Sequence, residues 1–141
     1  MKRLERWSLR IGFVLGAVTR VVYGGLRYLG TVNGEFGSEP NPWQPFWQHA
    51  HVLAAPLLLF ALGVAARGHV QGMLGRGVRR GRRTGLVLVA LVVPLVLGGY
   101  AIQVVTGTGI RNTLGWSHAA LGALFAALYL VHWAKPRSNG T

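Results

Sequence analysis

Four long apolar runs constrain the fold of this 141-residue chain more than any other feature of its sequence. They cover about residues 9–29, 45–66, 84–105 and 116–134. An α-helix of about 20 residues, rising about 1.5 Å per residue, spans the roughly 30 Å hydrocarbon core of a bilayer. The sequence therefore predicts an all-α integral membrane protein, a four-helix bundle that forms one domain over residues 1–141.

The charged residues predict how the bundle is oriented. Only 13% of the residues are charged, yet the formal net charge is +12. Most basic residues lie at the edges of the apolar runs, which argues for a membrane partner and against nucleic acid. They precede the first run, separate the second from the third, and follow the fourth: Lys2, Arg3, Arg6, Arg10; Arg67, Arg76, Arg79, Arg80, Arg82, Arg83; Lys135, Arg137. The loops at 30–44 and 106–115 carry only Arg111, Glu35 and Glu39. The positive-inside rule then places both termini and the Arg-rich loop in the cytoplasm.

Histidine is the main residue type here that can bind a metal. The chain has no cysteine, which excludes disulfides, iron–sulfur clusters and covalently attached c-type haem. Ionisable residues within a membrane are costly and tend to be functional. The five histidines belong to the second and fourth runs or their ends: His49, His51, His69, His118 and His132.

Helix geometry predicts which histidines share a face. His118 and His132 are 14 residues apart, which brings them within about 40° of one face and separates them by about 21 Å. His51 and His69 are 18 residues apart, or five full turns and about 27 Å. His49 points about 200° away from His69, so we interpret it as a hydrated interfacial residue.

Two facing histidine pairs follow from this geometry. We expect His51 with His118 near the outer side, and His69 with His132 near the inner side. Two imidazoles that face each other across an apolar bundle are what axial ligation of a haem b requires. For His69 the alternative of a simple interfacial residue stays open. Glycines weaken the helix there, and the two members of the inner pair lie at different distances from their outer partners, about 27 Å for His69 and about 21 Å for His132.

Other polar or small residues are candidates for cofactor contacts. Arg20 lies in mid-span, where a buried guanidinium needs an anion, so we expect a haem propionate or another subunit as its partner. Gly24 and Gly98 leave room for a macrocycle, or serve close helix packing. Tyr100 and Gln103 are candidates for a quinone pocket, with helix–helix hydrogen bonding as the alternative.

The stretches that carry these histidines resemble a known group of proteins. Trp47-Gln48-His49-Ala50-His51-Val52-Leu53-Ala54-Ala55-Pro56 is similar to the second helix of small four-helix membrane b-type cytochromes, and the fourth run, with Trp116-Ser117-His118 and His132-Trp133, resembles their fourth. The group includes cytochrome b561 and the cytochrome b subunits of hydrogenases and formate dehydrogenases. The resemblance covers about residues 8–134. It implies two haems b, and electron transfer between a quinone and a partner protein.

Two functions are therefore weighed. The first is a di-haem cytochrome of the bacterial cytoplasmic membrane, an electron-transfer subunit of a membrane oxidoreductase complex with a quinone and a redox partner subunit. The second is non-redox: a small membrane anchor or assembly subunit, or a histidine-based ion carrier. The facing histidines favour the first, because an anchor has no need of them.

Overall fold

The computed structural model describes residues 3–35, 37–77 and 81–134, and four long helices make up most of them. These helices are α1 (Arg3–Tyr28), α2 (Gln44–Ala65), α4 (Arg82–Val104) and α5 (Thr108–Ala134). Each contains a stretch long and apolar enough to cross a membrane. The all-α prediction is thus confirmed, and the helices indicate a multi-pass membrane protein. Lys2, Arg79, Arg80, Lys135 and Arg137, which entered the charge argument, lie outside the described residues.

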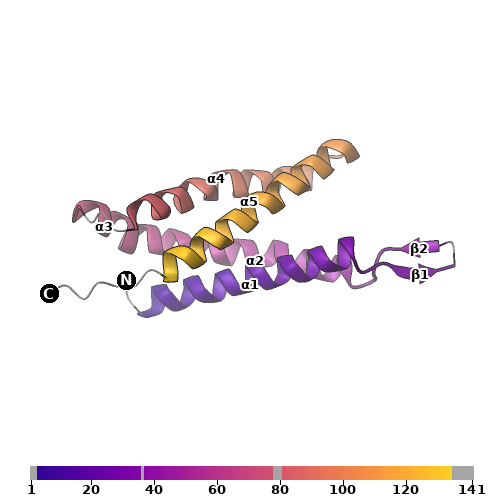
Figure 1. Ribbon diagram of the computed structural model, residues 1–141, viewed down its shortest axis with the longest axis horizontal. Helices are drawn as coiled ribbons and strands as arrows, with labels where there is room; N and C mark the ends of the chain where they lie inside the picture. Colours follow the sequence, from indigo (N-terminus) through magenta and orange to yellow (C-terminus); the bar gives the residue numbers. More distant parts are fainter. Residues whose placement is uncertain (1–2, 36, 78–80, 135–141) are drawn as a thin grey trace. The chain divides into compact units, whose positions relative to one another are not determined.

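The helices pack as two antiparallel pairs (Figure 1). The unit Met1–Gly77 contains α1 packed on α2, and the unit Val78–Thr141 contains α4 packed on α5. The structure describes each unit by itself, so the expectation of a single four-helix bundle stays a prediction.

Glycines set the close packing of α1 on α2. A Cβ atom built on the buried Gly12 would lie only 3.0 Å from the Cα of Leu58, and one on Gly16 would lie 3.7 Å from a methyl of the same leucine. Small residues four positions apart let two helix backbones approach closely, which is how helices associate in lipid. One turn further towards the N-terminus of α1, an apolar cluster continues this contact: Leu9, Ala61, Ala65 and the adjoining Leu62.

Most large apolar side chains of these helices are exposed. Phe60 on α2 is 73% exposed, and Leu97 on α4 is 65% exposed. Contiguous apolar surface on this scale marks an interaction site, and lipid tails solvate it without cost. Pro56 within α2 and Pro94 within α4 fit the same setting, because spanning helices tolerate internal proline.

Three features differ from the sequence prediction, and the first is the start of the last helix. The predicted loop over 106–115 is wrong, since α5 already begins at Thr108. Hydropathy places a boundary where polarity changes, whereas the helix begins where its first backbone hydrogen bond forms, here from the Arg111 N–H to the Gly107 carbonyl over 2.9 Å. Residues 108–115 are polar, so hydropathy alone misses them.

The second difference is a β-hairpin in the loop between α1 and α2. Strands β1 (Val32–Gly34) and β2 (Gly37–Glu39) pair in antiparallel register, with Val32 opposite Glu39. Gly37 has a φ of +113°, a conformation that favours glycine. The predicted loop at 30–44 therefore contains a short hairpin.

The third difference is at the end of the second span. The helix does not stop at Ala66 but continues as a π-helix, η1 (Ala66–Val70), and a short α3 (Gln71–Gly75). His69 thus lies within helical structure. Because π-helical hydrogen bonds run from i to i+5, each residue turns by less than in an α-helix. The rotation about the helix axis from His51 to His69 is therefore less than the five full turns expected for an unbroken α-helix.

Candidate functional site

Four histidines are half-buried, and the fifth is exposed. His51 lies on α2, His69 on η1, and His118 and His132 on α5, all half-buried, whereas His49 is exposed. His51, the residue that the helical spacing favours over His49, contacts α1, whereas His49 is exposed; whether His51 also faces the other unit stays a prediction. Each unit therefore holds two half-buried histidines.

His51 contacts a threonine of the neighbouring helix. Thr19 Oγ1 on α1 lies 3.1 Å from Nδ1 of His51. Thr19 is only 7% exposed, and its hydroxyl also lies 2.7 Å from the carbonyl oxygen of Leu15 one turn earlier. A buried hydroxyl needs such partners. The polar contact therefore fixes the His51 ring against α1.

Arg20 follows Thr19 directly, and its partner within the unit is aromatic. Its guanidinium carbon lies 5.6 Å from the centroid of the Tyr23 ring, and one of its nitrogens lies 3.8 Å from where a Cβ of Gly24 would be. A cation over an aromatic face gains about 2 kcal/mol when desolvated. The structure thus brings together two predicted cofactor contacts, Arg20 and Gly24, close in sequence to the threonine that holds His51.

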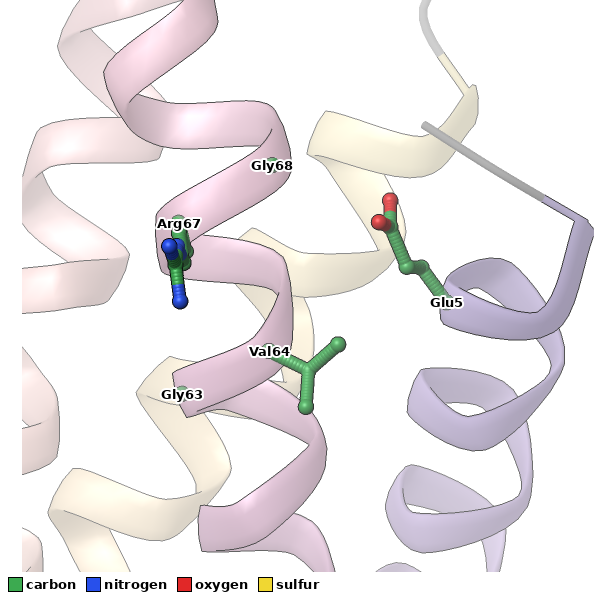
Figure 2. Close-up of a pocket in the computed structure, with 5 residues that line it drawn as sticks. All are labelled: Glu5, Gly63, Val64, Arg67 and Gly68. Atoms are coloured by element: carbon green, nitrogen blue, oxygen red, sulfur yellow. The ribbon is translucent and has the colours of Figure 1, made fainter.

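A shallow groove of about 550 Å³ adjoins the π-helix that contains His69. Figure 2 shows Glu5 of α1 extending towards Gly68, with Val64 between the two helices. A Cβ on Gly68 would come within 2.8 Å of a Glu5 carboxylate oxygen, so a larger residue here would displace the Glu5 side chain. Gly63 and Arg67 complete the lining. The groove thus combines the Val64 side chain and two glycines with the Glu5 carboxylate, and Figure 2 shows the Arg67 side chain on the side of the helix away from Glu5.

His118 lies against two consecutive glycines of α4. Its Nδ1 atom is buried and lies 3.5 Å from where a Cβ of Gly98 would be. Its Cε1 atom lies 3.4 Å from the corresponding position on Gly99. A Cβ at either position would already be in van der Waals contact with the ring. Gly98, predicted to leave room for a macrocycle, thus makes room for the imidazole of His118.

His132 repeats this arrangement at the other end of the same helix pair. Its Cε1 atom lies 3.5 Å and 3.4 Å from the Cβ positions of Gly81 and Gly85, and its Nδ1 lies 3.0 Å from Thr84 Oγ1. His118 and His132 both contact α4, as their 14-residue spacing predicts for one face of α5. The predicted pairs, His51 with His118 and His69 with His132, each join the two units, so the pairing stays a prediction.

The candidate quinone residues of α4 lie on its surface. Tyr100 is 61% exposed, and Gln103 is exposed with its side-chain amide donating to the carbonyl oxygen of Gly99 over 3.2 Å. Both therefore present polar groups towards the outside of the α4–α5 unit. This position suits a lateral contact with a lipid-soluble ligand or with another helix.

No group of three or more His, Cys, Asp or Glu side chains gathers within residues 3–35, 37–77 and 81–134.

Sequence reasoning missed the two threonines. Each ends a Gly-x-x-Thr stretch, at residues 16–19 and 81–84. The sequence shows each of them as a hydroxyl residue within or at the edge of an apolar run. This feature points to a histidine partner only when the helix that packs beside the threonine is known.

The four apolar helices indicate the class, a multi-pass α-helical membrane protein, here with half-buried histidines on α2, η1 and α5. Models of known protein families, curated protein sequences and solved structures give no match to this chain. The function is therefore argued from the residues.

Proposed function

We propose that this protein is a di-haem b-type cytochrome of the bacterial cytoplasmic membrane that transfers electrons between a quinone and a redox partner protein. The observation that supports it most is the placement of His118 and His132. The His118 ring lies against Gly98 and Gly99, and the His132 ring lies against Gly81 and Gly85, so the two imidazoles lie at different heights along one apolar helix pair. An imidazole within a membrane is costly, and two such rings at two depths suit two metal centres better than they suit an anchor.

The ligands would come from both units. His51 with His118, and His69 with His132, would be the axial ligands, and Arg20 beside Gly24 would bind a propionate. Haem b, when bound, supplies the one-electron change between ferric and ferrous iron. The chain's own contribution is to hold the imidazoles at fixed depths and to exclude water with apolar helices.

A quinone and a protein partner complete the proposal. The groove beside η1 is the candidate site for a quinone ring, because the Glu5 carboxylate supplies a hydrogen-bond acceptor beside Val64 and two glycines. Tyr100 and Gln103 are the alternative location. A redox partner would dock on the predicted cytoplasmic side, because most of the arginines lie there and would attract an acidic partner surface.

A haem-to-protein ratio tests the proposal. We expect the protein, purified in detergent, to be red and to give about two haems b per chain in a pyridine haemochrome assay. A colourless protein that still fails to take up added haemin would contradict the proposal. It would favour the non-redox alternative, a membrane anchor or a histidine-based ion carrier.

A further inference from the structure

The two threonine–histidine contacts have the same chemistry in both units. Thr19 Oγ1 lies 3.1 Å from Nδ1 of His51, and Thr84 Oγ1 lies 3.0 Å from Nδ1 of His132. In each case the threonine belongs to the first helix of its pair and the histidine to the second. The nitrogen involved is Nδ1 both times, so the contact bears on which tautomer each ring adopts.

The backbone contact of each threonine fixes the direction of its hydrogen bonds. Thr19 Oγ1 lies 2.7 Å from the Leu15 carbonyl oxygen, and Thr84 Oγ1 lies 3.0 Å from the Gly81 carbonyl oxygen. Two oxygens at these distances repel unless a hydrogen lies between them, and a carbonyl has none to give. The single hydroxyl hydrogen therefore points at the carbonyl, and the hydroxyl can only accept from the imidazole.

We infer that Thr19 and Thr84 are positioning residues that hold His51 and His132 in the Nδ1–H tautomer and leave the lone pair of each ring on Nε2. A neutral imidazole binds a metal through its unprotonated nitrogen, and the hydrogen bond of the other nitrogen sets which one that is. The inference rests on the proposed function only where it assigns Nε2 as the iron ligand. The tautomer itself follows from the apoprotein.

The other half-buried histidine of each unit, His69 in one and His118 in the other, has a different environment. His69 lies on the π-helix, and His118 is packed against Gly98 and Gly99. With the predicted pairing, each haem would therefore have one axial histidine oriented by a threonine. The threonine-held ligand is His51 for the outer haem and His132 for the inner one.

Nitrogen-15 NMR of the histidine rings in detergent-solubilised apoprotein tests the assignment directly. We expect Nδ1–H signals for His51 and His132 in the wild type. Thr19→Val, which keeps the shape and removes the hydroxyl, should shift His51 towards the other tautomer and leave His132 unchanged. Thr19→Ser should restore the wild-type spectrum. Thr113→Val is the matched control, because Thr113 donates to Gly109 one turn earlier in the same way but is exposed.

Haem affinity supplies the second readout. Loss of a hydrogen bond to a metal-binding histidine typically weakens metal binding about 10–100-fold, so Thr19→Val should weaken one of two haem sites by that factor and Thr19→Ser should not. An Nε2–H tautomer of His51 in the wild type, or an unchanged tautomer in Thr19→Val, would overturn the inference. The expected tautomers in a protein that takes up no haem would instead refute the proposed function and support the assignment of the two threonines.

Discussion

The Cε1 atom of His118 lies 3.4 Å from the point where a Cβ of Gly99 would stand, so the ring of α5 is seated directly on the backbone of α4. A Cβ at this distance would already touch the ring, so the additional methyl groups of a branched side chain would press on the imidazole. The position of His118 therefore depends on a glycine 19 residues earlier in the chain.

The first prediction tests this seat. Gly99→Val should displace His118 and reduce the haem content by about one per chain, because the iron would lose one axial ligand. Gly109→Val is the control, since a Cβ at Gly109 meets no atom within 4 Å. The haem-to-protein ratio and the low-spin absorption spectrum of both variants measure the effect. Unchanged spectra in Gly99→Val would show that His118 is not a ligand.

The second prediction separates two histidines that lie two residues apart. His51→Ala should remove one low-spin haem b, and so should His118→Ala. His49→Ala should leave the spectrum nearly unchanged, because His49 is exposed whereas His51 contacts Thr19. Absorption spectra of the three purified variants decide between them. Loss of haem in His49→Ala together with none in His51→Ala would contradict the assignment.

The third prediction concerns topology. The charge bias of the loops predicts both termini and the loop between α3 and α4 on the cytoplasmic side, with the β-hairpin outside. Green fluorescent protein fused after Thr141 should therefore fluoresce, and a periplasmic phosphatase fused there should be inactive. A phosphatase inserted between Gly34 and Gly37 should be active. The opposite pattern would reverse the orientation.

The helices could be predicted from the sequence because apolar runs of bilayer length leave the backbone few alternatives. The predicted third run, 84–105, and α4, Arg82–Val104, nearly coincide. The start of α5 was missed because residues 108–115 lie outside the apolar run. There the backbone hydrogen bonds, and not hydropathy, determine where the helix begins.

The site was predictable in part. Histidine spacing predicted that His118 and His132 share a face of α5, and both contact α4; the spacing also favoured His51 over His49, and of these two His51 contacts the neighbouring helix. The threonines could not be found this way. A contact such as Thr84 with His132 joins residues 48 positions apart, and it depends on which helices pack together rather than on any local pattern. The π-helix at His69 escaped for a similar reason, since an α-helical count assumes one unbroken geometry.

The fourth prediction tests the groove beside η1. Gly68→Ala should weaken electron transfer from a soluble quinol analogue to haem and leave the haem spectrum intact, because its Cβ would come within 2.8 Å of a Glu5 carboxylate oxygen. Gly75→Ala is the control, since its Cβ would lie in open space. Stopped-flow reduction of the haem measures both. Equal rates in the two variants would move the quinone site elsewhere, with Tyr100→Phe and Gln103→Ala as the next variants to compare.

The last prediction concerns the number of haems, and it depends on the inner histidines. His132 lies in the last turn of α5 and is held by Thr84, so it has the same polar support as His51. A cytochrome that carries electrons across the bilayer also needs a centre in the inner half. We therefore expect two haems per wild-type chain, with His69→Ala and His132→Ala each removing the same one and His51→Ala removing the other. Redox titration resolves the two centres and shows which component each variant lacks. A wild-type ratio near one, with His132→Ala spectrally silent, would leave a mono-haem protein whose ligands are His51 and His118.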